Sequence, residues 1–227
     1  MLRRSMGVSR LALALATLVA TAPVLAAGPD GAAMEQYLRS KHYMDRLFKL
    51  GIYWDRNVLQ RQQQCQENYE VEPTTFMLLD PPQFEAGNPV PVHGIWQQRF
   101  RLSRCGETVT YNAIAVAKSG NVELQPQVPG ESRAGPSLIK DLYEQAVAVE
   151  SANMTEAKGD CKKVLVTDTW VSLPPAPRVL GGQTIDNVWE EEWTMDRCGT
   201  EFQMSFCFKP SAQQSGVDWA PRNCNSL

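Results

Sequence analysis

The feature that most constrains the fold of this chain is an internal duplication. The segment WQQRFRLSRCG, residues 96–106, matches the segment WEEEWTMDRCG, residues 189–199, and every aligned pair of positions is 93 residues apart. Tryptophan, arginine, cysteine and glycine are identical in the two copies. The double prolines at residues 81–82 and 174–175 lie at the same offset. A repeat of this extent predicts two structural units built on one plan.

Hydrophobic patterns assign the same elements, in the same order, to both copies. Apolar residues recur at helical spacing in residues 33–62 and again in residues 136–149. The patterns that follow are typical of strands, and they cover residues 96–104, 108–117, 164–171, 189–197 and 201–208. In the last of these strands, one face is expected to carry the alternating apolar side chains of Phe202, Met204, Phe206 and Phe208.

The expected fold class is therefore α+β, with two tandem repeats that each consist of a helix followed by an antiparallel β-sheet, stabilised by disulfides. Residues 28–130 form the first repeat and residues 131–227 form the second, with a loop at residues 126–136 as their junction. Each Cys-Gly pair predicts a tight turn between strands. Each double proline predicts a connection that separates one strand from the next.

The N-terminus carries the pattern of a bacterial signal peptide. Residues 1–27 begin with a basic stretch, continue with an apolar stretch that is too short to cross a bilayer, and end in small residues. We expect cleavage after Ala26 or Ala27, a periplasmic or secreted location, and no integral membrane segment in the mature chain. The signal peptide holds three arginines, so the mature chain has 19 basic and 25 acidic side chains. A net charge of −6 argues against nucleic acid as a partner.

The six cysteines of an exported chain predict three disulfides. The start of one strand of an antiparallel hairpin lies beside the end of the other, so each repeat should bridge those two places. The expected pairs are Cys65–Cys105, Cys161–Cys198 and, for the C-terminal tail, Cys207–Cys224. The chain has two histidines and no CxxC pair. We therefore expect no metal site and no cofactor.

The tryptophan strand of the second copy offers the one candidate binding site. Trp189, Glu191 and Trp193 share a face of this strand, together with Met195 and Arg197. The first copy has the same face, from Trp96 to Arg104. One interpretation makes both faces part of the core, with the arginine at the solvent-exposed end of each strand. The other makes the two tryptophans a stacking surface for a sugar or a cation, with Glu191 as a polar anchor. Both interpretations stay open at the level of the sequence.

The opposite face of the same strand reverses its charge between the two copies. It carries Arg99 and Arg101 in the first copy, and Glu190, Glu192 and Asp196 in the second. Two interpretations are possible. The strands of the two copies could pair and match these charges, or each face could be solvated on its own.

The run WxExWxxxxCG at residues 189–199 resembles a motif of uncharacterised exported proteobacterial proteins. The first copy departs from the motif, with Gln98 in place of glutamate and Phe100 in place of tryptophan. Because that family has no assigned activity, the resemblance implies a periplasmic setting and no mechanism.

The sequence therefore favours a non-catalytic binding or interaction protein of the bacterial cell envelope. It contains no GxSxG, HExxH, P-loop or Rossmann glycine pattern. The expected partner is an envelope or secreted protein, and a glycan is the less favoured ligand. Two alternatives stay open: an inhibitor or immunity-type protein against a secreted enzyme, and a glycan hydrolase that uses Glu191 or a nearby carboxylate.

Overall fold

The computed structural model describes residues 29–61, 65, 69–156, 164–212, 216–222 and 224. The predicted signal peptide and Cys161 lie outside the described residues. No helix within the described residues is long and apolar enough to cross a membrane.

The first half of the chain begins with helices and continues as an antiparallel meander. The helices are α1 (Pro29–Leu38) and α2 (Lys41–Tyr53), and α2 runs on into a π-helical turn (Trp54–Val58). Four strands follow: β1 (Glu70–Gln83), β2 (His93–Arg104), β3 (Glu107–Lys118) and β4 (Asn121–Gln127). The predicted helix at residues 33–62 is therefore divided at Ser40. This residue caps α2 because its side-chain oxygen accepts a hydrogen bond from the backbone N–H of Tyr43.

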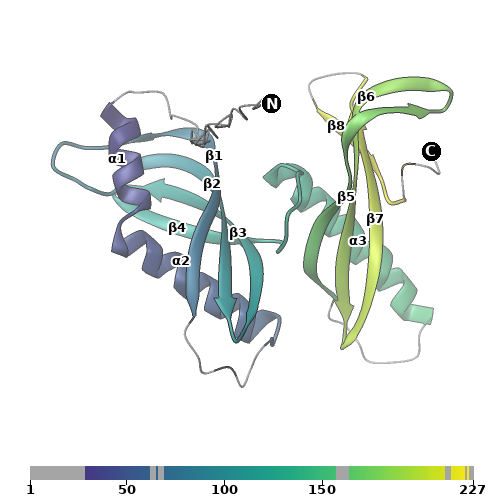
Figure 1. Ribbon diagram of the computed structural model, residues 1–227, viewed down its shortest axis with the longest axis horizontal. Helices are drawn as coiled ribbons and strands as arrows, with labels where there is room; N and C mark the ends of the chain where they lie inside the picture. Colours follow the sequence, from purple (N-terminus) through teal and green to yellow (C-terminus); the bar gives the residue numbers. More distant parts are fainter. Residues whose placement is uncertain are drawn as a thin grey trace, which may run out of the picture.

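The second half repeats this order with a single helix. Helix α3 (Pro136–Glu156) is followed by strands β5 (Val164–Leu180), β6 (Gln183–Arg197), β7 (Thr200–Pro210) and β8 (Val217–Ala220). The strand orders are β1-β2-β3-β4 in one sheet and β5-β6-β7-β8 in the other. Figure 1 shows α2 against the first sheet, α3 against the second, and the chain passing once between the two halves. The predicted α+β class, with antiparallel sheets, is confirmed.

The central hairpins of the two sheets have the same register. Trp96 lies opposite Ala115 in the β2–β3 pair, and Trp189 lies opposite Phe208 in the β6–β7 pair. Trp189 follows Trp96, and Phe208 follows Ala115, by the same 93 positions that separate the two copies in the sequence. The predicted tight turns are also present. Cys105 and Gly106 have φ values of 45° and 78°, and the second turn repeats this with 49° and 89°. Positive φ at both central residues is what a two-residue hairpin turn requires.

The double prolines are not connections between strands, and that prediction was wrong. The first pair lies inside β1 and the second lies inside β5. Both strands are at the edge of their sheet, and proline is tolerated in edge strands and at bulges, where few ladder hydrogen bonds are lost. The register of both strands also shifts at the prolines, between Asp80 and Gln83 in β1 and between Leu173 and Ala176 in β5.

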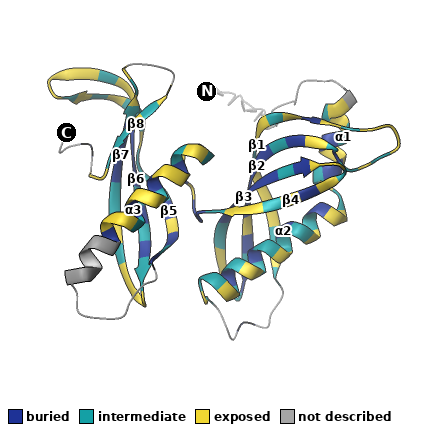
Figure 2. Cartoon of the chain, turned by 180° about the vertical axis from the view of Figure 1, so that it is seen from behind, coloured by how far each residue is buried: buried dark blue, intermediate teal, exposed yellow. Residues whose placement is uncertain are grey.

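Each half has its own hydrophobic core between its helix and its sheet. Trp96 and Phe100 are fully buried in the first core, and Trp193 and Phe206 are fully buried in the second. Figure 2 shows the buried positions along the central strands, with the outer sides of α2 and α3 exposed. On β7 the predicted apolar face is confirmed, since its four residues all pack in or against the second core: Phe202, Met204, Phe206 and Phe208.

The arginine that ends each tryptophan strand was expected at a solvent-exposed end, and for Arg104 this is wrong. Its side chain is fully buried, and its Nη2 and Nε donate to the two carboxylate oxygens of Asp55 at 2.7 and 3.0 Å. The Asp55 carboxylate also accepts a hydrogen bond from Tyr111 Oη at 2.9 Å. Burial alone would lower the pKa of Arg104, but the hydrogen bonds and charge of Asp55 outweigh it and the pKa is raised. Arg197 repeats this arrangement by pairing with Glu150 of α3.

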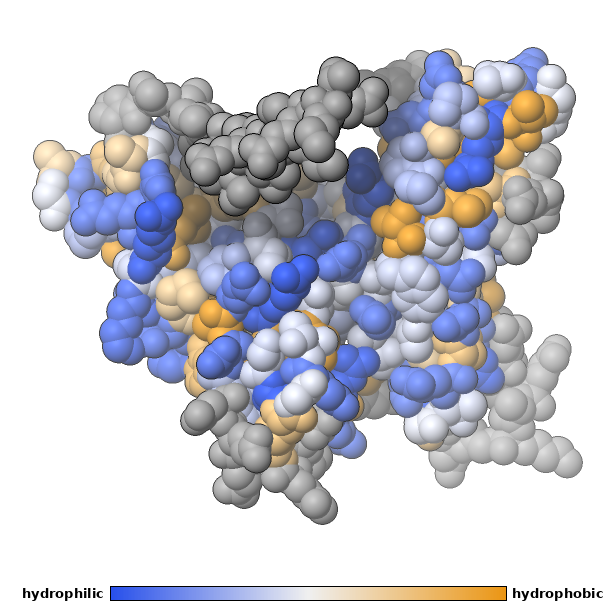
Figure 3. Space-filling view, viewed as in Figure 1, coloured by the Kyte–Doolittle hydropathy of each residue, from blue (hydrophilic) through white to orange (hydrophobic). Residues whose placement is uncertain are grey.

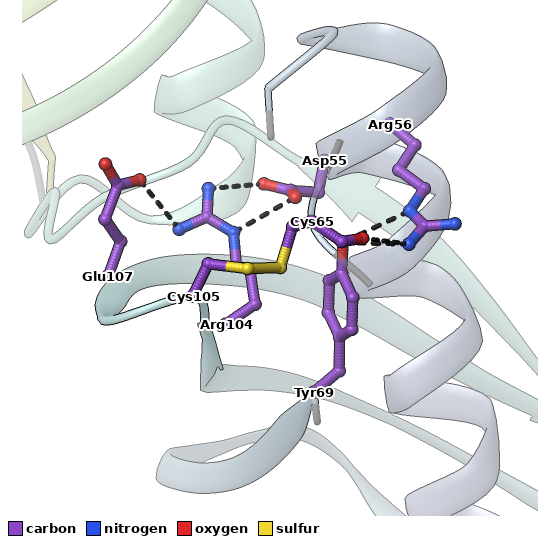
Figure 4. The surroundings of a disulfide bond; sticks show 7 residues. All are labelled: Asp55, Arg56, Cys65, Tyr69, Arg104, Cys105 and Glu107. Atoms are coloured by element: carbon purple, nitrogen blue, oxygen red, sulfur yellow. Dashed lines mark hydrogen bonds and ion pairs between the residues drawn. A yellow bond between two sulfur atoms is a disulfide. The ribbon is translucent and has the colours of Figure 1, made fainter. Parts of the chain in front are cut away.

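Two predicted disulfides are confirmed. Cys65 is bonded to Cys105, beside the Arg104–Asp55 pair (Figure 4), and Cys207 is bonded to Cys224. Cys198 is also disulfide-bonded, but its predicted partner Cys161 lies outside the described residues.

Removing the Cys65–Cys105 disulfide should destabilise the protein by roughly 2–4 kcal/mol, because the bond restricts the conformations that the unfolded chain can adopt. This bond spans a sequence separation of 40, and the Cys207–Cys224 bond spans 17. Replacing Cys65 and Cys105 with serine should therefore lower the free energy of unfolding more than replacing the other pair. Urea unfolding of the two double variants measures both values. A larger loss from the shorter loop would contradict the expectation.

Candidate functional site at the junction of the two halves

The segment that joins the two halves is folded into the structure rather than solvated. This segment, residues 128–135, is called the linker below, and it runs from the end of β4 to the start of α3. Val128 and Ala134 are buried and belong to the second core. Ser132 between them is also buried, with 4% of its surface exposed. A loop was predicted here, and residues 128–135 do form a loop, but one that is largely buried.

Gly130 is the point of closest approach between the linker and the second sheet. Its φ is +96°, and a β-carbon there would lie 2.2 Å from the carbonyl oxygen and 2.3 Å from the nitrogen of Thr169. No side chain fits in that space, and only glycine adopts this φ without strain. The neighbouring Glu131 N–H donates to the same Thr169 carbonyl oxygen at 2.6 Å. The backbone of the linker therefore lies directly on β5.

The first half holds the linker through two side chains from its sheet. Asn112 on β3 donates from its amide nitrogen to the carbonyl oxygens of Val128 and Gly130, each at 2.9 Å. Arg99 on β2 donates from Nη2 to the carbonyl oxygen of Ser132 at 2.6 Å and from Nε to Asn112 Oδ1 at 3.0 Å. The two side chains thus fix each other as well as the linker.

The second half holds the linker through Glu191 and Thr169. Glu191 is fully buried, and its Oε1 accepts hydrogen bonds from the backbone N–H of Arg133 at 2.8 Å and from Trp189 Nε1 at 3.0 Å. Its Oε2 accepts from Trp193 Nε1 at 3.1 Å. Thr169 adds a hydrogen bond from its hydroxyl to the carbonyl oxygen of Pro129 at 2.7 Å. Glu191 therefore satisfies three donors at once.

The three residues predicted as a binding site are brought together, but inside the protein. Trp189 is 6% exposed, and Trp193 and Glu191 are fully buried. The indole ring of Trp189 stacks on the Phe208 ring at 4.7 Å, and the Trp193 ring packs against Phe206. The interpretation of this face as an open stacking surface for a sugar or a cation does not fit, because the aromatic faces are already covered by other rings. The core interpretation of this face is the correct one.

Glu191 also lacks the setting of a glycosidase acid. Both of its oxygens accept hydrogen bonds from protein donors, and none of its surface is exposed. A general acid must instead reach a substrate oxygen and exchange its proton. No group of three or more His, Cys, Asp or Glu side chains among the described residues could hold a metal ion.

The charged outer faces of the two copies do not pair with each other, because β2 and β6 lie in different sheets. Glu190 instead accepts from the backbone N–H of Cys224 at 2.6 Å, and Arg101 lies 3.8 Å from Glu72 of its own sheet. Arg99 is the exception, since it contacts the linker. Burial lowers the pKa of its guanidinium, and the charges of Glu131 and Glu191 offset part of this effect.

The sequence did not identify the linker contacts. Glu191 was singled out, but its backbone partner Arg133 is 58 positions away, and no local pattern connects the two. Asn112 is a lone amide in the apolar run of β3. A polar residue in such a run indicates that its side chain has a polar partner elsewhere in the fold, but not which one. Gln97, which lies beside Arg99 at the same junction, was not singled out at all.

Comparison with known proteins gives no further guide. No protein-family model matches the chain, and searches of curated proteins and of solved structures give no significant match. Any function must therefore be inferred from the residues themselves.

Proposed function

We propose that this chain is an exported, non-catalytic interaction protein of the bacterial cell envelope, and that its partner is an envelope or secreted protein. The expected signal peptide and the resemblance to exported proteobacterial proteins support the location, and the disulfides are compatible with it. We also propose that the two halves are copies of one unit, which the shared hairpin register supports.

The observation that carries this proposal is the exposed apolar edge of the first sheet. Strand β1 is first in the strand order, and among the described residues it pairs with β2 alone. Its consecutive residues Met77, Leu78 and Leu79 are 40%, 39% and 44% exposed. An exposed edge offers unpaired backbone N–H and C=O groups, and these are the groups to which an extended segment of a partner can add as a further strand.

The chemistry of β1 also indicates the kind of segment that would add. Apolar side chains are exposed on both faces of the strand, while Glu70 and Glu72 are exposed at its start. An extended segment with apolar residues and a basic end complements this edge. The binding energy would come from backbone hydrogen bonds and from covering Leu78 and Leu79.

Photo-crosslinking at β1 tests the proposal. A crosslinking amino acid placed at Thr74 or Leu79 of the full chain, expressed with its own signal, should give one discrete protein adduct. The same amino acid at Lys140, on an exposed face of α3, is the matched control and should give none. Adducts that form equally at all three positions, or at none, would overturn the proposal.

The adduct protein can then be purified and its affinity measured directly. Leu79→Glu should weaken its binding by about tenfold or more, because losing a buried leucine contact costs roughly 1.5–3 kcal/mol. Val149→Glu is the control for an added charge, since Val149 on α3 is 43% exposed and belongs to neither candidate surface. Equal affinities of the two variants would show that β1 is not the contact.

A second candidate function, inhibition of a secreted enzyme, is favoured by one specific observation. The β5–β6 hairpin extends past the third strand, because β7 pairs with β6 only from Trp189 onward. Its tip is a Gly181-Gly182 turn, and Val179 beside it is highly exposed. Leu180 and Ile185 of this hairpin pack against the cluster around Val188 and Cys207, so the exposed tip is the part that could enter an enzyme cleft. An adduct formed at Val179 but not at β1 would favour this candidate.

A further inference from the structure

A cavity of about 360 Å³ opens where the outer face of the first sheet meets the linker. The residues that carry the argument come from three segments: Thr75 and Met77 of β1, Gln97 and Arg99 of β2, and Ser132 and Arg133 of the linker. Its volume lies at the lower end of the range found for small-molecule sites, about 300–1,000 Å³. In Figure 3 hydrophilic residues are prominent on the surface between the two halves. The cavity shares Met77 with the exposed stretch of β1, but Leu78 and Leu79 do not line it.

Gln97 is the first sign that this cavity is built for a ligand. The residue is nearly buried, with 8% of its surface exposed, and its side chain forms no hydrogen bond within the described part of the chain. Its amide is not among the polar atoms closed off from solvent, so it faces the cavity that it lines. Its neighbours across the sheet are Met77 on one side and Ile114 on the other, and neither side chain can pair with an amide. An amide that opens into a cavity and has no protein partner is available to hydrogen-bond a ligand or a water there.

Arg99 is the second sign. Asn112 and the Ser132 carbonyl oxygen accept from its Nε and Nη2, which fixes the plane of the guanidinium. These contacts use two of its five N–H donors, and the other three have no acceptor among the described residues. Glu131 and Glu191 act on Arg99 through their charge, but neither forms an ion pair with it. A guanidinium held in this way is pre-organised to donate to a further acceptor.

We propose that this cavity binds a small organic monocarboxylate. Its oxygens accept hydrogen bonds from the free donors of Arg99 and from the amide nitrogen of Gln97, and its apolar part contacts Met77. A carboxylate suits these donors because a guanidinium and an amide together present N–H groups to both oxygens. One negative charge is favoured over two, since a phosphate dianion would also be repelled by Glu131 and Glu191. Arg133 adds a second cation at the exposed side.

The first test uses hexanoate and hexanamide as a matched pair that differs in the charged group. NMR spectra of the oxidised mature chain, with the Gln97 side-chain amide and the Arg99 Nε–H assigned, report binding at the site itself. Hexanoate should shift both signals and bind about tenfold or more tightly than hexanamide, as expected for hydrogen bonds to a charged group. Equal binding of the pair, or tighter binding of inorganic phosphate, would overturn the proposal.

Variants then separate a binding role from a structural one. Gln97→Met removes the unpaired amide, so it should leave the unfolding midpoint unchanged or raise it, while hexanoate binding falls about fivefold or more. Arg99→Gln should lower the affinity further. Arg101→Gln, on the same face of β2, is the control and should bind normally. A destabilised Gln97→Met protein that still binds hexanoate would contradict the proposal. Leu79→Glu should keep hexanoate binding, so this result is independent of the partner at β1.

Discussion

Replacing Arg104 with alanine is expected to lower the free energy of unfolding by about 3–5 kcal/mol. The substitution leaves the Asp55 carboxylate buried with Tyr111 as its remaining hydrogen-bond donor. A buried charge that loses its partner is far more costly than the pair itself is stabilising. Urea unfolding with the disulfides intact measures the loss.

The same strand supplies the control for this prediction. Arg101 is three positions earlier and forms a long ion pair with Glu72, in which both side chains are about half exposed or more. Arg101→Ala should therefore cost no more than about 1 kcal/mol. If the two alanine variants lose the same stability, the Arg104–Asp55 pair is not the buried contact that we describe. The double variant Asp55→Leu and Arg104→Met should recover much of the loss, because no charge is then left buried.

Replacing Glu191 with alanine should cost at least about 3 kcal/mol, because two buried N–H groups and one that is partly buried lose their acceptor at roughly 1–3 kcal/mol each. Two of them are the indole groups of Trp189 and Trp193, and the third is the backbone of Arg133 in the linker. The effect should therefore reach the contact between the halves. Hydrogen exchange at the Arg133 amide, together with the unfolding free energy, measures both consequences.

Glu192 is the matched control, since it lies next to Glu191 and on the opposite face of the strand. It is half-buried and accepts a hydrogen bond from Ser205 Oγ at 3.3 Å. Glu192→Ala should cost less than about 1 kcal/mol and leave exchange at Arg133 unchanged. Glu191→Gln should lie between wild type and Glu191→Ala, because the amide keeps one acceptor oxygen and places its NH₂ against an indole donor. A fully stable Glu191→Ala protein would refute this account of the linker.

Local patterns were sufficient to predict most of the secondary structure. The strands β2, β6 and β7 largely alternate apolar and polar residues, and β3 was assigned as the counterpart of β7 in the first copy. Each Cys-Gly turn requires a positive φ at its two central residues. The Cys65–Cys105 bond was predictable because the duplication reduced the possible pairings. The helix break before α2 could have been found from Ser40, because serine is a preferred N-cap residue and its partner Tyr43 is only three positions away.

The errors arose where structure depends on distant residues. Proline was taken to end a strand, but β1 and β5 are edges, and edge position is a property of the whole sheet. Arg104 was placed in solvent because its partner Asp55 lies 49 positions earlier, in the π-helical turn that follows α2. The candidate cavity was missed for the same reason, since β1, β2 and the linker meet there only after folding.

The close approach at Gly130 also has a practical consequence for engineering this chain. From the sequence, residues 128–135 are the natural place to open the chain for a circular permutant or to insert a reporter. In the folded protein that insertion would have to enter a gap where even a methyl group would collide with Thr169. The Gly181-Gly182 turn is the better site, because a β-carbon at either glycine meets no atom within 4 Å. A label placed there leaves both sheets and their junction undisturbed.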